Sequence, residues 1–213
     1  MEMFFMDKVI KRLSQGSFFR SIFSGLLKIV AVITAILGIV GFIYGLTNLG
    51  GPDSPIGFFG YVSEIIVLIV MLKITWINVQ ILWVRGGTIN DLQESDFNII
   101  PIMSVLLKTM GETTAVTMAV LAVAGGIFMQ GAYLVLRNIL FIPLPFFGIN
   151  GYSFSFAGRA VFMLSGLLYA FTMLILFYFL SEILVAVVDI AQHAKAIRII
   201  AEQSKYTRVD KQE

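Results

Sequence analysis

The sequence predicts an all-α integral membrane protein whose four transmembrane helices form two antiparallel hairpins with helical cytoplasmic extensions. Composition is the first reason, because 58% of the 213 residues are hydrophobic and only 13% are charged, against about 25% charged in a typical soluble domain. The second is that four apolar runs reach the roughly 20 residues that a helix needs to cross a bilayer. The third is that polar and turn-forming residues separate these runs. We therefore expect a four-helix bundle within the membrane.

The first span is expected at residues 21–46, after a segment at 1–20 that mixes apolar and basic positions and suits a membrane surface as an amphipathic helix. Lys28 is the one charge in this span and lies near its N-terminal end, where a long side chain reaches the headgroups. Gly41 and Gly45 form a Gly-x-x-x-Gly pair, which allows another helix to approach closely. This span should therefore pack tightly against a neighbouring helix.

Two long helices joined by a short polar loop form the centre of the predicted fold. The second span is expected at 57–84, and the loop at 86–96, which begins with a turn at two glycines. The third span is expected at 113–136, and the residues from Pro101 onward should extend this helix, because proline suits a first helical turn. Small residues at spacings of about three and four predict a closely packed face on this helix. They are Ala115, Ala119, Ala122 and Gly126.

The fourth span is expected at 160–182, and the helical pattern continues beyond it into a cytoplasmic helix and tail at 183–213. Apolar residues in this part recur at alternating steps of four and three, which is the spacing by which helices pair. They are Ile183, Val187, Ile190, Ala194, Ile197 and Ala201. We name the first five the heptad seam. It must pack either on projecting parts of the second and third helices or on another protein.

The distribution of basic residues predicts the orientation of the chain. Lys and Arg concentrate before the first span and in the C-terminal tail, while the loop at 47–56 has neither. Cytoplasmic segments carry the excess of Lys and Arg in multi-pass proteins. We therefore expect both termini in the cytoplasm.

The composition argues against most enzymatic and metal chemistry. The chain has no Cys and a single His, His193, which leaves no thiolate nucleophile, no disulfide and no Cys-based metal site. Nucleophile-elbow, phosphate-binding and dinucleotide-binding motifs do not occur in the sequence. The basic tail interleaves acidic residues and lacks an aromatic platform, which favours contact with anionic lipid over nucleic acid. We expect no metal, no cofactor, no nucleic-acid partner and no enzymatic activity.

Four ionisable residues within or beside the spans are the candidate functional charges: Lys28, Lys73, Glu112 and Glu182. Ionisable groups are rare at membrane depth and mark functional sites by default. Three interpretations stay open at this point. The charges can form structural ion pairs, line an ion or proton path, or bind lipid headgroups.

The central hairpin favours a pair between Lys73 and Glu112. If its ends near Arg85 and Pro101 lie level, both residues are about 17–18 Å along their helices at about 1.5 Å per residue. An unpaired Lys at the bilayer centre costs about 3 kcal/mol on insertion scales, so a carboxylate at equal depth is the expected remedy. Glu182, near the inner end of the fourth span, is the competing partner.

Two segments, Asp91–Glu112 and Leu184–Arg198, resemble stretches of small uncharacterised bacterial multi-pass membrane proteins. The resemblance covers about a fifth of the chain. It implies a bacterial inner (plasma) membrane, and it carries over no activity and no site residue.

The sequence favours a non-enzymatic subunit or scaffold of a larger membrane protein assembly, which binds its partners through transmembrane and cytoplasmic helices. This expectation rests on the missing catalytic motifs, the small-residue face and the heptad seam. The expected partners are membrane lipids and either another membrane protein or further copies of the chain. The alternative is an oligomeric ion or proton channel that uses Lys73, Glu112 and Glu182.

Overall fold

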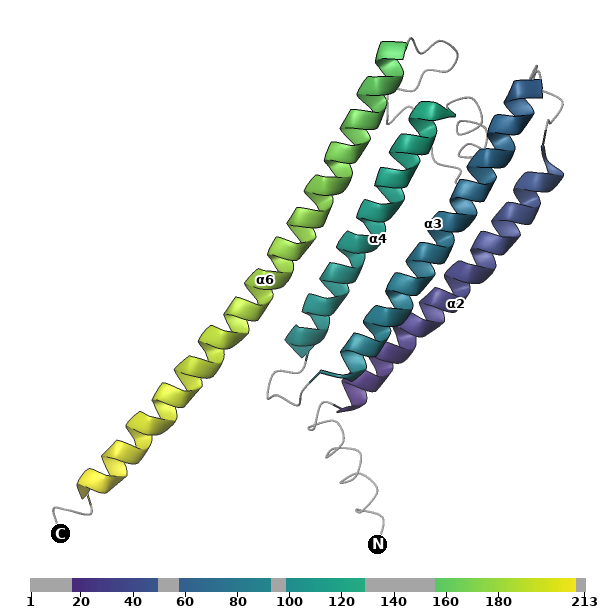
Figure 1. Ribbon diagram of the computed structural model, residues 1–213. Coiled ribbons are helices and arrows are strands. Elements are labelled where there is room, and N and C mark those ends of the chain that lie inside the picture. The colour runs from purple at the N-terminus through teal and green to yellow at the C-terminus, as the bar shows by residue number, and fades with distance from the viewer. Residues whose placement is uncertain (1–16, 50–57, 93–98, 129–155, 210–213) are drawn as a thin grey trace, which may run out of the picture.

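The structure, a computed structural model, describes residues 17–49, 58–92, 99–128 and 156–209. This part of the chain folds into four long helices, which are α2 (Ser17–Thr47), α3 (Phe58–Asn90), α4 (Ile99–Ile127) and α6 (Phe156–Val209) (Figure 1). Each helix is long and apolar enough to cross a membrane. The predicted fold class is therefore confirmed: the protein is a multi-pass membrane protein whose described residues form four helices, each able to span a membrane. The expected amphipathic helix falls largely on residues 1–16, outside the described residues.

The second helix is longer than predicted because the chain does not turn at its two glycines. The loop expected from residue 86 is wrong in its first part, since α3 stays helical from Gly86 through Asn90. Gly86 is buried against α2, and a Cβ placed there would lie 3.2 Å from the carbonyl oxygen of Ser24. The glycine therefore serves the close approach of two helices rather than a turn.

The third and fourth helices both extend beyond their predicted spans. α4 begins at Ile99 with Pro101 in its first turn, as the sequence predicts for the extension of this helix. Residues 129–136 of the predicted third span lie outside the described residues. α6 runs unbroken through the predicted fourth span and the C-terminal helix. Its 54 residues measure about 81 Å at about 1.5 Å each, far more than the roughly 30 Å hydrocarbon core of a bilayer.

The helices lie side by side in chain order, α2, α3, α4 and α6 (Figure 1). The closest packing is within two antiparallel hairpins, α2 with α3 and α4 with α6, and α3 joins them by packing on α4. The expected bundle is therefore an open row, in which α2 and α6 form the two edges and do not pack along each other. Along the helix axes, the start of α2 and the end of α6 lie on the same side of the molecule. On that side α6 projects well beyond the other helices (Figure 1).

Small residues seven positions apart hold α2 against α3. Ser24 and Ala31 are buried, and Gly38 and Gly45 continue the same repeat. A Cβ at Gly38 or Gly45 would collide with side chains of α3, those of Thr75 and Leu68 respectively. A seven-residue repeat keeps one face of a helix toward its partner, and small residues let the two backbones approach where lipid offers no hydrophobic drive. Of the predicted glycine pair, Gly45 thus lies in this contact.

The predicted small face of the third helix packs on α6. Ala115, Ala122 and Gly126 are buried, and a Cβ at Gly126 would collide with the side chain of Met163 on α6. Ala122 lies directly opposite Gly166 of α6, so two small residues meet there. The fourth predicted member of this face, Ala119, is half-buried. Close packing along this pair of helices positions α6 and hence the part of it that projects.

Candidate functional site

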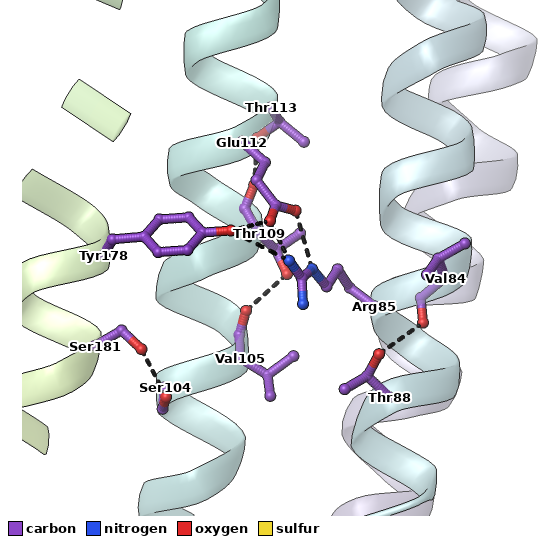
Figure 2. Close-up of polar contacts among 10 residues, drawn as sticks. All are labelled: Val84, Arg85, Thr88, Ser104, Val105, Thr109, Glu112, Thr113, Tyr178 and Ser181. Atoms are coloured by element: carbon purple, nitrogen blue, oxygen red, sulfur yellow. Dashed lines mark hydrogen bonds and ion pairs between the residues drawn. The ribbon is translucent and has the colours of Figure 1, made fainter. Parts of the chain in front are cut away.

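Charged and polar side chains of three helices meet in the half of their length that is nearer the projecting part of α6. Arg85 of α3, Glu112 of α4 and Tyr178 of α6 point toward one another (Figure 2), and we name these three residues the ion cluster. Arg85 Nε donates to Glu112 Oε2 at 2.9 Å, and Arg85 Nη2 forms an ion pair with Glu112 Oε1. Tyr178 Oη donates to the same Oε1 at 2.5 Å and lies 3.4 Å from Arg85 Nη2. The carboxylate thus joins three helices.

The geometry of the ion cluster suits a partly apolar setting. A guanidinium presents two parallel N–H groups that match the two oxygens of a carboxylate, which makes this pairing stronger and more directional than a Lys pair. The side chains of Arg85 and Glu112 are only 24% and 19% exposed. Their charges cancel, so the pair can occupy a membrane helix interface at less cost than either charge alone. Lys108 lies beside the cluster, with its Nζ 5.6 Å from the centroid of the Tyr178 ring.

Two further polar contacts connect the same helices. Asn78 of α3 donates through Nδ2 to Thr117 Oγ1 of α4 at 2.9 Å. Ser104 of α4 and Ser181 of α6, both buried, share a hydrogen bond of 2.7 Å (Figure 2). Hydrogen bonds across membrane helices contribute about 0.6 kcal/mol each on average, so these contacts contribute more to register than to stability.

The expected pairing of Lys73 with Glu112 is wrong. It assumed that Arg85 is level with Pro101 at the start of α4, but Arg85 meets Glu112, eleven residues farther along α4, and the continuation of α3 to Asn90 accounts for only part of this shift. The contacts of Arg85 with Glu112 and of Asn78 with Thr117 set the actual alignment. Lys73 lies twelve residues before Arg85, or about 18 Å farther along α3 at about 1.5 Å per residue. That distance is far beyond the reach of an ion pair.

The other three candidate charges, Lys28, Lys73 and Glu182, differ in how far the neighbouring helices cover them. Lys28 is half-buried, and its Nζ lies 5.7 Å from the centroid of the Trp83 ring across the α2–α3 contact, within the range of a cation–π interaction. Lys73 and Glu182 are exposed on the single chain, so no other helix among the described residues covers either side chain. Spacing along the sequence placed them within the spans but did not determine which way each helix is rotated.

The heptad seam is exposed along α6. Ile190 and Ile197 are 69% and 67% exposed, and Ile183, Val187 and Ala194 are exposed as well. Because Ser104 is paired with Ser181, the start of α4 at Ile99 is level with about residue 186. The rest of α6 therefore projects past α4 by about 34 Å at about 1.5 Å per residue. No helix in the described part of the chain covers the seam, which excludes α3 and α4 as its partners.

Arg85 and Tyr178 are site residues that the sequence did not reveal. Arg85 was placed at the end of a helix, where a basic residue is ordinary, and Tyr178 stands among apolar residues of the fourth span. The signal that identifies them is their alignment with Glu112, and that alignment depends on where α3 ends and how α4 and α6 are paired. No spacing within one helix contains this information.

The described residues include no group of three His, Cys, Asp or Glu side chains that could hold a metal ion. Within the ion cluster the carboxylate accepts hydrogen bonds on both oxygens, so its immediate effect is to tie α3, α4 and α6 together. None of the protein-family models, characterised proteins or solved structures compared with the chain matches it. The assignment as a four-span membrane protein therefore rests on the length and composition of its own helices.

Proposed function

We propose that this protein is a non-enzymatic subunit or scaffold of a larger membrane protein assembly. The observation that carries the proposal is the heptad seam, an apolar heptad face that is exposed on α6 and lies, from Val187 onward, on the part of α6 that extends beyond the other three helices. A contiguous apolar face of this kind, bordered by polar residues, is typical of a protein interaction site. The heptad spacing is typical of pairing with another helix.

The energetics of the seam favour a bound partner. Burying one Val or Ile side chain contributes about 1.5–3 kcal/mol, and four of the five seam residues are of these types. Left in water, these side chains would favour aggregation, whereas a helix from a partner would cover them. The opposite faces of this part of α6 carry charged and polar residues, which keeps them compatible with solvent.

The ion cluster supports the same function by fixing the direction of α6. Tyr178 is about eight residues before the point where α6 extends past the start of α4, and its hydroxyl is tied to Arg85 and Glu112. A helix held at its base by hydrogen bonds and close packing presents its projecting face in a defined position. A scaffold needs such an arm, and nothing in this geometry calls for a chemical step.

We further propose a bacterial inner membrane and a topology with both termini in the cytoplasm. The excess of Lys and Arg in the terminal segments compared with the loop at 47–56 supports the topology. The bacterial membrane rests on the sequence resemblance of two segments alone, which none of the comparisons matches. Reporter domains fused after Glu213 should report a cytoplasmic position, and reporters inserted at 50–56 should report the opposite side. Reversed signals from the two fusions would contradict this orientation.

Variants of the seam test the proposed function directly. Ile190→Glu and Ile197→Glu should remove the protein from its assembly, measured by native mass spectrometry after extraction in mild detergent. Gln192→Glu is the matched control, because it adds the same charge to an exposed position on another face of the same helix. A wild-type protein that stays monomeric without a stoichiometric partner, or equal effects of all three variants, would contradict the proposal.

The channel alternative receives less support from the geometry. Of its three candidate charges, Glu112 is engaged by Arg85 and Tyr178, while Lys73 and Glu182 are exposed and lie at different levels of the row. These residues do not line a common path in the single chain. A conductance measurement on the purified protein in planar bilayers should therefore show no ion current.

A further inference from the structure

One face of α3 is not covered by any other helix in the described part of the chain. Five exposed residues follow it at steps of four, three, four and three. They are Ile69, Lys73, Trp76, Gln80 and Trp83. We name these five residues the outer face of α3. The residues of α3 that contact its neighbours point the other way, such as Thr75 toward α2 and Asn78 toward α4. At 3.6 residues per turn, Lys73 and Gln80 lie on the side roughly opposite both contacts. Trp76 and Trp83 lie toward the edge of this face that is nearer α2, where the centroid of the Trp83 ring is 5.7 Å from Lys28 Nζ.

The bilayer midplane can be placed on α3 by way of α2. The stretch of α2 between Lys28 and Thr47 contains no charged residue, and its midpoint falls next to Gly38. Gly38 packs directly against Thr75 of α3. Thr75 therefore marks the middle of the membrane on α3.

The charge-free stretch of α6 independently places the bilayer midplane at nearly the same level. The stretch 160–181 of α6 is free of charged residues. On α4, Gly111 contacts Phe177 and Ala122 contacts Gly166. Thr117 lies between these two contacts and is therefore level with the midpoint of that stretch. Thr117 is hydrogen-bonded to Asn78 of α3. The two routes thus place the midplane between Thr75 and Asn78.

Lys73 and Gln80 lie on either side of this plane. Each is about 5 Å from the level midway between Thr75 and Asn78 at about 1.5 Å per residue, well within the roughly 15 Å half-thickness of the hydrocarbon core. Exposed Ile and Trp side chains are compatible with lipid at this depth. A lysine ammonium and a glutamine amide are not, because neither finds a hydrogen-bond partner in acyl chains. The outer face of α3 therefore needs a polar partner.

The charge of Lys73 indicates what the partner is. In the described segments no carboxylate is level with it: Glu64 is nine residues away on α3, or about 14 Å, and Glu112 is level with Arg85. A second copy of the chain in the same orientation would bring its own Lys73 to this depth and no acid. Charge complementarity therefore favours a different protein over self-association.

We propose that the outer face of α3 binds a transmembrane helix of a different protein, on which an Asp or Glu near the midplane pairs with Lys73. Gln80, one heptad away, hydrogen-bonds to the same helix, and Trp76 packs between the two polar contacts. An ion pair across the interface removes the cost of a lysine in lipid, so it also makes this subunit dependent on its partner. The inference rests on the proposed function, because it names a partner and a site for the assembly.

The test uses variants that make α3 more apolar. Lys73→Met and Gln80→Leu suit a lipid-facing helix at least as well as the natural residues, so the isolated chain should insert and keep its unfolding midpoint. We expect Lys73→Met to reduce the assembly on native gels of solubilised membranes by about tenfold or more, and Lys73→Arg to retain it. A carbodiimide, which joins an amine to a contacting carboxylate, should link Lys73 in wild-type membranes to an acidic residue in an apolar segment of another protein.

Three results would overturn the inference. An intact assembly with Lys73→Met would refute the pairing, and the proposed function would survive if Ile190→Glu still released the subunit. A carbodiimide link from Lys73 to a carboxylate of a second copy would replace the heteromeric partner with a homo-oligomer. If wild-type membranes contain no assembly at all, the inference and the proposed function both fail.

Discussion

The ion cluster makes a quantitative prediction about coupling between helices that are distant in the sequence. Removing one member of a buried ion pair costs about 3–5 kcal/mol, because the remaining charge is left unpaired. Arg85 and Glu112 keep 24% and 19% of their side-chain surface exposed, and that residual solvation lowers the expected cost to about 1–3 kcal/mol for each single variant. Arg85→Met and Glu112→Gln should therefore each reduce the free energy of unfolding by this amount.

The double variant separates pairing from other effects of the two substitutions. With both charges removed, no unpaired charge remains, so the loss should be smaller than the sum of the single losses by about 1–2 kcal/mol. Unfolding can be followed in mixed micelles by SDS titration with tryptophan fluorescence as the signal. Tyr178→Phe, which removes one donor to Glu112, should cost about 1 kcal/mol.

A control double-mutant cycle uses Lys73 and Glu112, the pair expected from the number of residues along the two helices. Lys73→Met combined with Glu112→Gln should show additive effects, because the two side chains are separated by about 18 Å along the hairpin. Additive losses in the Arg85–Glu112 cycle, or coupling of equal size in the Lys73–Glu112 cycle, would refute the register on which the site is built.

Two further predictions concern helix packing. Gly111→Ala should lower stability by about 1–3 kcal/mol, because its Cβ would lie 2.7 Å from Cβ of Phe177 on α6. The control is Gly25→Ala, which has nothing within 4 Å and should be neutral or stabilise by about 0.5–1 kcal/mol. Equal effects of the two variants in thermal unfolding would contradict the α4–α6 contact. Ser104→Ala should cost about 1 kcal/mol by leaving Ser181 without its 2.7 Å partner, and replacing both serines with Ala should cost no more than that. A double variant that loses twice as much would argue that the two hydroxyls do not interact.

Local composition was sufficient for the number and type of the elements. A helix that crosses a bilayer must satisfy its backbone hydrogen bonds internally and be apolar over about 20 residues, and both conditions can be read from one segment at a time. The small face containing Ala115, Ala122 and Gly126 was predictable for a similar reason, because its spacing follows the helix period. The continuation of α6 was also visible, since no turn-forming residue interrupts its pattern.

The end of α3 was not predictable in this way. Gly86 and Gly87 are turn residues by propensity, and only the close passage of α2 shows why a glycine stands at residue 86 within a helix. Continuation of the helix to Asn90 moves every residue of α3 relative to α4. This helix end, together with the assumption that Arg85 is level with Pro101, placed Lys73 opposite Glu112 and removed Arg85 from consideration.

The sequence by itself determined four helices that can cross a membrane and the apolar seam of α6, because hydrophobic length and periodicity are properties of single segments. Only the tertiary structure decided which charges meet, since pairing depends on the register and rotation of helices that are far apart in the chain. It also decided that Lys73 is exposed on the single chain while Glu112 is engaged with Arg85 and Tyr178. An ionisable residue in an apolar helix looks the same in the sequence whether it faces a partner, lipid or a neighbouring helix, because its own segment does not fix which side of the helix is covered.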